Sequence, residues 1–212
     1  MKILLLLFII GLSAAYLFGA IAAPSGTTMP DTALLIIDVQ NFYFAGGRLP
    51  LTNPVEAGLQ AKALLEKFRG RKMPIFHVRH LPAGKEGSPP RTDDPQYAIH
   101  SSVTPLAGEK VIVKHEANSF RDTPLLGELK SAGIRKLILC GMQTHMCVEA
   151  AVRAAVDFGF EVTLASDACA TRALAFGGRE IPAETVQAVT LAVLNRSYAR
   201  VMTTAAILAE LP

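Results

Sequence analysis

Short apolar runs alternate along this chain with segments of helical periodicity, and this alternation constrains the fold more than any other feature. Each run has only four to seven residues and several are rich in β-branched side chains, which favours strands buried on both faces. The predicted strands cover 33–39, 74–78, 111–114, 136–141, 161–164 and 199–202. The predicted helices cover 54–68, 124–132, 145–158 and 182–195.

Strands that alternate with helices in one chain predict a parallel sheet with helices on both faces. We therefore expect an α/β protein: a three-layer α/β/α sandwich with a six-stranded parallel sheet in the Rossmann-like order 3-2-1-4-5-6. The hydrophobic content of 50% and the charged content of 18% fit one packed domain without repeats. Residues 81–106 are rich in proline, glycine, serine and charge, which predicts a long surface loop.

The N-terminal segment differs in kind from the rest of the chain. Residues 1–23 hold one lysine followed by an apolar stretch that ends in an A-x-A-like cleavage site. We interpret them as a signal peptide or, if uncleaved, an N-terminal membrane anchor; a buried helix is the remaining alternative. Residues 24–32 then form a linker, and 33–212 form the domain, which is expected to be exported (periplasmic or secreted) or membrane-anchored. Membrane contact is expected only through the N-terminal segment.

Charge and cysteine content exclude some classes of function. The 21 basic and 18 acidic side chains give a formal charge of +3, without a basic run, so nucleic acid is not an expected partner. Three cysteines are too few for a disulfide framework, so we predict no structural disulfide.

Three chemically reactive side chains lie at the carboxyl ends of the predicted strands one, three and four, where parallel strands share one edge of the sheet. Asp38 ends the first strand, Lys114 ends the third, and Cys147 lies in the first turn of the helix after the fourth. Ligands bind at such strand ends in open α/β sheets. A helix N-terminus favours thiolate, so Cys147 is a candidate nucleophile. Each residue also has an ordinary structural explanation: Asp38 as a cap or an ion-pair partner, Lys114 as a surface lysine, and Cys147 as a buried packing residue. Cys140 and Cys169 fit the packing explanation better than Cys147 does.

Three segments, at residues 35–40 (LIIDVQ), 113–120 (VKHEANSF) and 141–148 (GMQTHMCV), resemble in order and spacing the signature regions of isochorismatase-like cysteine hydrolases. The similarity continues to Thr204, so it covers essentially all of the chain after the leader. The resemblance implies the isochorismatase-like fold and a catalytic triad of Asp38, Lys114 and Cys147. It also implies a cis peptide between Met142 and Gln143.

The mechanism that the resemblance implies is covalent catalysis. Asp38 takes the thiol proton and returns it to the leaving group, Lys114 stabilises the thiolate, and Cys147 forms a thioester that water hydrolyses. The backbone N–H groups of Gln143 and Cys147 are the expected oxyanion hole.

Departures from related enzymes refine these expectations. Nicotinamidases of this superfamily carry an Asp-x-His-type metal cluster, but this chain has no histidine before His77 in the corresponding stretch, so we predict no catalytic metal and no cofactor. Isochorismatases proper often lack the nucleophilic cysteine, so its presence argues against vinyl-ether hydrolysis. Candidate substrate-binding residues, for which ordinary packing is an equal alternative, are Phe42, Phe44, Phe120 and His145.

The expected function is hydrolysis of a small amide, ureide or lactam by an amidohydrolase that acts on non-peptide C–N bonds. Two alternatives remain: isochorismatase-type hydrolysis of another small carbonyl or ether substrate, and a non-catalytic exported protein that binds a small molecule. The expected partner is a small-molecule substrate. Apolar helices such as 183–194 and the resemblance also predict a homo-oligomer, either a dimer or a tetramer.

Overall fold

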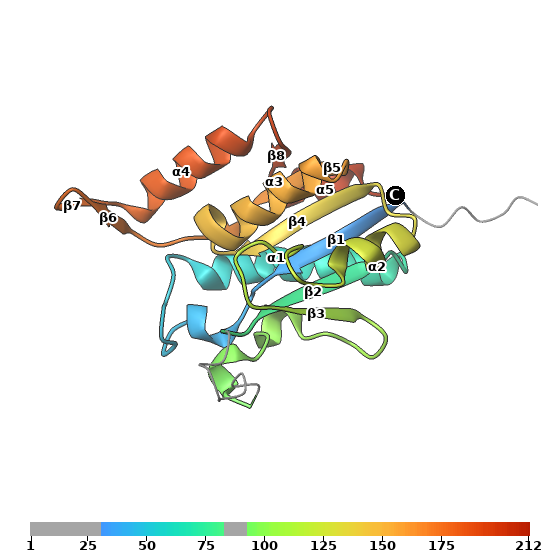
Figure 1. The fold of residues 1–212 in the computed structure, drawn as a ribbon, viewed down its shortest axis with the longest axis horizontal. Coiled ribbons are helices and arrows are strands. Elements are labelled where there is room, and N and C mark those ends of the chain that lie inside the picture. Colours follow the sequence, from blue (N-terminus) through green and yellow to red (C-terminus); the bar gives the residue numbers. More distant parts are fainter. Residues whose placement is uncertain (1–30, 83–92) are drawn as a thin grey trace, which may run out of the picture.

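The computed structural model describes residues 31–82 and 93–212. Its centre is a six-stranded parallel sheet in the order β3-β2-β1-β4-β5-β8, which confirms the predicted order with β8 as the sixth strand (Figure 1). The strands are β1 (Thr32–Ile37), β2 (Ile75–His80), β3 (Lys110–Lys114), β4 (Lys136–Met142), β5 (Glu161–Ala170) and β8 (Arg200–Met202). The signal-peptide and linker predictions fall almost entirely outside the described residues.

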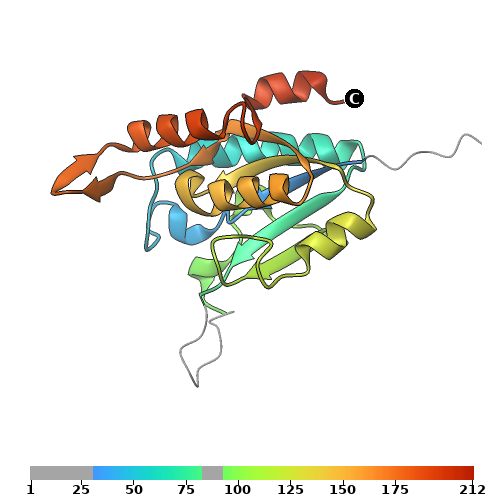
Figure 2. The same ribbon diagram turned by 45° about the horizontal axis from the view of Figure 1, so that its top comes forward.

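Helices cover both faces of the sheet, as predicted (Figures 1 and 2). They are α1 (Pro54–Gly70), α2 (Leu125–Ser131), α3 (Glu149–Asp157), α4 (Ala183–Leu194) and α5 (Thr204–Glu210). None of the helices in the described ranges is both long and apolar enough to cross a membrane.

The alternation of side chains along β1 explains the three layers. Leu35 and Ile37 point to one face and pack with residues of α2 and α3, whereas Leu34 and Ile36 point to the other and pack with α1 and α5. Because β1 is central and buried on both faces, its residues from Ala33 to Ile37 are at most 2% exposed.

The structure extends some predicted elements and adds others. Strand β2 runs two residues further than predicted, to His80, and β5 continues to Ala170. A hairpin of β6 (Leu174–Phe176) and β7 (Arg179–Ile181) stands out from the rest of the fold beside α4 (Figures 1 and 2). The hairpin and α4 expose the apolar side chains of Phe176 (83%), Val189 (58%) and Val193 (47%).

The region predicted as a loop, 81–106, is not wholly irregular. Two short 3-10 turns, η2 (Pro95–Tyr97) and η3 (Ser101–Val103), lie in its described part, and a third, η1 (Asn41–Tyr43), follows β1. The η1 and η2 turns are tied together by the hydrogen bond from Asn41 Nδ2 to the Pro95 carbonyl (2.9 Å). This places the described end of the loop beside the carboxyl edge of the sheet.

Candidate active site

Asp38 lies at the carboxyl edge of the sheet, directly after β1. Its backbone has φ = 51°, in the left-handed region that aspartate tolerates better than most residues, and its N–H donates to the Val78 carbonyl of β2 (3.1 Å). The side chain is completely buried. A left-handed residue directly after a buried strand is a feature often found at functional sites.

Lys114 ends β3, and its side chain reaches back across β2 to Asp38. The Lys114 ammonium lies 2.8 Å from Asp38 Oδ2 and donates a hydrogen bond to the Ala117 carbonyl at 2.8 Å. Both side chains of the ion pair are 0% exposed. The structure therefore brings together the two charged residues of the predicted triad, although β2 lies between their strands, β1 and β3.

Cys147 reaches the same edge through the turn after β4. Gly141 allows β4 to run close to β1, because a Cβ at Gly141 would lie 1.9 Å from the Ile37 carbonyl oxygen, and its φ of +133° also favours glycine. The Met142–Gln143 peptide is cis, at the position that the resemblance indicated. Cys147 then sits in η4, a π-helical turn (Thr144–Val148) that leads directly into α3, so it lies in the first turn of this helical segment. Such π-turns often occur at functional sites.

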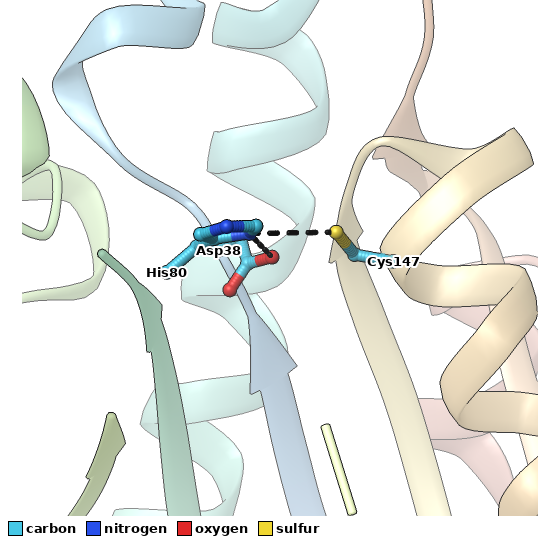
Figure 3. A group of neighbouring side chains, drawn as sticks. All are labelled: Asp38, His80 and Cys147. Atoms are coloured by element: carbon cyan, nitrogen blue, oxygen red, sulfur yellow. Dashed lines mark hydrogen bonds and ion pairs between the residues drawn. The ribbon is translucent and has the colours of Figure 1, made fainter. Parts of the chain in front are cut away.

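His80 completes the cluster. Its Nδ1 lies 3.9 Å from the Cys147 Sγ and 3.9 Å from the Asp38 Oδ2 (Figure 3). The His80 side chain is 27% exposed, whereas Cys147 as a residue is 4% exposed and Asp38 is fully buried. The imidazole is therefore the most exposed part of an otherwise buried group of reactive side chains.

Burial dominates the ionisation of the cluster. Burial raises the pKa of Cys147 to about 12, and the Asp38 carboxylate adds to this rise while Lys114 opposes it. Burial also raises the pKa of Asp38, against the lowering effect of Lys114. Burial therefore works against the thiolate form that a helix N-terminus was expected to favour. A neutral thiol beside a carboxylate of raised basicity suits proton transfer at the moment of attack.

The cluster also has the donor atoms of a metal site. One atom each from Asp38, His80 and Cys147 lies within 4.8 Å of the others, a combination that could hold a transition metal. However, the Lys114 ammonium already lies 2.8 Å from Asp38 Oδ2 and would repel an incoming cation. The arrangement suits proton transfer better than a resident metal, and metal independence stays a prediction.

The other predicted site residues have structural contacts of their own. Gln143 is buried and donates through Nε2 to the Tyr43 hydroxyl (3.2 Å). The ring of Phe42 packs on Tyr43, with 4.0 Å between centroids. His145 is half-buried, and its Nδ1 lies 2.5 Å from Thr171 Oγ1.

Phe44 and Phe120 lie in the hydrophobic core. Phe44 stacks on His100 at 3.5 Å between ring centroids, and Phe120 packs against Phe158 at 5.3 Å and Phe160 at 6.2 Å. These packing contacts are sufficient to explain why Phe44 and Phe120 are buried. Contact of either ring with a substrate stays a prediction.

Two residues of this region were not foreseen from the sequence. His80 ends β2 at the same edge as Asp38 and Lys114, so the rule that selected those two residues would have found it had the strand been predicted to its full length. Arg172 follows β5, and its buried Nε has no hydrogen-bond partner among the described residues. Burial is the main cause that lowers the pKa of His145, and the positive charge of Arg172 lowers it further. No periodic pattern in the sequence marks Arg172.

Comparisons with known proteins agree with the geometry. A family model for the isochorismatase domain matches residues 32–206. The isochorismatase family protein YddQ of Bacillus subtilis (strain 168) is 45% identical over 177 residues, covering 84% of this chain and 98% of YddQ. The secreted isochorismatase effector Isc1 of Verticillium dahliae is 37% identical, with coverages of 75% and 79%. A streptothricin hydrolase of Streptomyces noursei is 32% identical, with coverages of 73% and 61%.

Solved structures show the same similarity. An isochorismatase from Pseudomonas putida KT2440 superposes with a TM-score of 0.76 at 39% identity, covering 83% of this chain and 89% of the other. A cysteine hydrolase from Pseudomonas syringae pv. phaseolicola 1448A shares the fold, with a TM-score of 0.79 at 22% identity, covering 84% and 91%. Family model, relatives and structures agree with the resemblance of the three segments around Asp38, Lys114 and Cys147, and the chain belongs to the isochorismatase family of hydrolases.

Proposed function

We propose that this hydrolase cleaves a small amide-like substrate (an amide, ureide or lactam) through a thioester on Cys147. The observation that carries this proposal is the buried Cys147 thiol in one cluster with the Asp38–Lys114 ion pair, whose charged atoms are 2.8 Å apart. A nucleophile with an adjacent base, itself held by a third group, is the arrangement that covalent catalysis requires. The 32% identity to a streptothricin hydrolase gives further support for a C–N bond as the target.

In the first half of the reaction, the Cys147 sulfur attacks the carbonyl carbon and its proton moves to Asp38. The C–N bond then breaks, the leaving amine takes the proton from Asp38, and a thioester to Cys147 remains. In the second half, Asp38 takes a proton from water, the hydroxide oxygen bonds to the acyl carbon, and the proton returns to the sulfur. Lys114 keeps Asp38 in place throughout and balances the negative charge of the cluster.

The oxyanion that forms in both halves needs hydrogen-bond donors that are already in place. We assign this role to the backbone N–H groups of Gln143, the N-cap of the π-helical turn, and of Cys147, which lies within that turn. The turn itself is held by the Gln143 carbonyl, which accepts from the N–H groups of Met146 (3.1 Å) and Val148 (3.2 Å). This backbone geometry does not depend on a flexible side chain.

One alternative is also compatible with the state of the Cys147 thiol. The Cys147 pKa of about 12 means that the free protein holds a neutral thiol. A neutral thiol is also compatible with isochorismatase-type hydrolysis of another carbonyl or ether substrate, in which Asp38 acts directly on substrate and water without a thioester.

Capture of the acyl group separates the two mechanisms. A panel of small primary amides, ureides and lactams is first screened for hydrolysis. Hydroxylamine is then added with substrates that share one acyl group but differ in the leaving amine. A common thioester predicts one ratio of hydroxamate to acid for all amines. A ratio that changes with the amine, or no hydroxamate at any hydroxylamine concentration, contradicts the thioester. Cys169→Ala, which removes another buried cysteine, serves as the control and should behave like the wild type.

A further inference from the structure

His80 is held in place by a buried glutamine. Gln40 Oε1 accepts from the His80 N–H (2.8 Å), and Gln40 Nε2 donates to the His80 carbonyl (3.0 Å) and to the Tyr97 carbonyl (2.7 Å). In the sheet, His80 is the register partner of Lys114. These contacts fix the backbone of His80 at the end of β2, so its imidazole starts from a defined position beside the triad.

A single nitrogen of His80 faces both groups between which the proton must move. Nδ1 lies 3.9 Å from the Cys147 Sγ, within reach of a hydrogen bond to sulfur, and 3.9 Å from Asp38 Oδ2, about an ångström beyond a normal hydrogen bond. A small rotation of the partly exposed ring would close that gap. The same oxygen, Asp38 Oδ2, lies 2.8 Å from the Lys114 ammonium.

We propose that His80 is a fourth catalytic residue, which accepts the proton of the Cys147 thiol as the sulfur attacks and passes it to Asp38. The S–H bond breaks as Nδ1–H forms; the Nδ1–H bond then breaks as Oδ2–H forms, and the imidazole returns to its neutral form with its proton on Nε2. No other reactant is needed. This inference rests on the proposed thiol chemistry and adds a proton acceptor between the sulfur and the carboxylate.

The charges around His80 are consistent with this role. Burial lowers the pKa of His80, Asp38 opposes the effect, and Lys114 and His115 add to it, so the ring is neutral and able to accept a proton at neutral pH. The ionisable groups whose charges act on the ring are Asp38, Lys114, His115 and Glu116, and the Cys147 thiol faces it as well.

Alkylation of Cys147 tests this role without a substrate. The second-order rate of iodoacetamide labelling of Cys147, followed by peptide mass spectrometry from pH 6 to 9, reports directly on loss of the thiol proton. We expect His80→Ala to slow labelling and to lower kcat/KM by about tenfold or more, in line with the contribution of acid–base groups. His80→Asn keeps a polar side chain that cannot carry the proton and should be equally slow. His100→Ala, whose ring nitrogen lies 3.0 Å from Ser102 Oγ and whose charge is not among those that act on His80, is the matched control and should change the labelling rate by less than about twofold.

Rescue separates proton transfer from a structural role. Because the His80 side chain is 27% exposed, added imidazole should reach the space left in His80→Ala and restore labelling in a concentration-dependent manner, while leaving the wild type unchanged. Normal rates in both His80 variants would overturn the proposal. So would slow rates in folded variants, judged by circular dichroism, that imidazole does not restore. Failure of the thioester itself would show separately, in the hydroxylamine experiment.

Discussion

Replacing Lys114 with methionine would leave the Asp38 carboxyl group buried without its cation. Both side chains are 0% exposed and their charged atoms are 2.8 Å apart. Removing one partner of a buried ion pair costs about 3–5 kcal/mol, because the remaining charge has lost both water and its counter-ion. We therefore expect the free energy of unfolding of Lys114→Met to fall by about that amount at neutral pH. This corresponds to roughly a hundred- to several-thousand-fold change in the ratio of folded to unfolded protein.

The loss of stability in Lys114→Met should grow as the pH rises. Burial already raises the pKa of Asp38, and loss of Lys114, which lowers it, would raise it further. A carboxyl whose folded pKa lies above its unfolded value of about 3.9 is more stable folded at low pH, so stability is lost as pH rises through the folded pKa. We therefore expect Lys114→Met to be nearly as stable as the wild type close to pH 4 and to become less stable than the wild type as the pH rises above 4.

Urea unfolding followed by circular dichroism at several pH values measures this effect, since the chain has no tryptophan. The double variant Asp38→Asn/Lys114→Met should regain most of the loss, because no charge is left buried. Lys110→Met is the matched control: the Lys110 side chain is 57% exposed and forms an ion pair with Glu128, and such surface pairs contribute about 0–1 kcal/mol. A loss below about 1 kcal/mol in Lys114→Met, or no recovery in the double variant, would refute the reasoning.

Three further predictions concern metal, acid and export. Activity should survive exhaustive treatment with EDTA or dipicolinate, and a loss restored specifically by zinc, iron or manganese would contradict this. Burial raises the pKa of Glu109, but hydrogen bonds from Arg69, the Leu106 N–H and His77 lower it to about 2. The stability that the ionised Glu109 contributes is therefore present above the pKa of this group in the unfolded chain, and it is lost as the pH falls towards 2. Urea unfolding from pH 6 to 2.5 should therefore show a steeper decline for the wild type than for Glu109→Gln. When the full chain is expressed in a bacterium, the mature protein should begin near Ala23, and N-terminal analysis that finds only full-length protein in the cytosol would contradict export.

Most of the fold could be predicted because its central strands are buried on both faces. A central strand such as 33–37 has to be apolar throughout, and that pattern is visible in a single sequence. The β6–β7 hairpin and α5 were missed for the opposite reason. They lie at the periphery of the sheet, where short elements such as 174–176 and 179–181 carry mostly half-buried or exposed residues and no clear periodicity.

The site was predictable in its members but not in its electrostatics. Asp38, Lys114 and Cys147 could be placed at one edge because strand order alone brings strand ends together. Their ionisation depends on how completely the surrounding side chains exclude water, and the sequence does not specify that. His80 was missed because the apolar run ends at Val78. The charged Arg79 that follows indicated the end of the strand, whereas β2 in fact continues through Arg79 to His80.

The Cys147 thiol carries the proposed chemistry, and its replacement tests that most directly. kcat/KM is measured for Cys147→Ala and for Cys169→Ala on a substrate found in the amide panel, with circular dichroism to confirm that both variants fold. Loss of the nucleophile should remove essentially all turnover, as in other enzymes whose catalytic residues act as a unit, while Cys169→Ala should stay close to the wild type. If Cys147→Ala keeps kcat/KM within about tenfold of the wild type, a difference of only about 1.4 kcal/mol in barrier height, Cys147 is not the nucleophile.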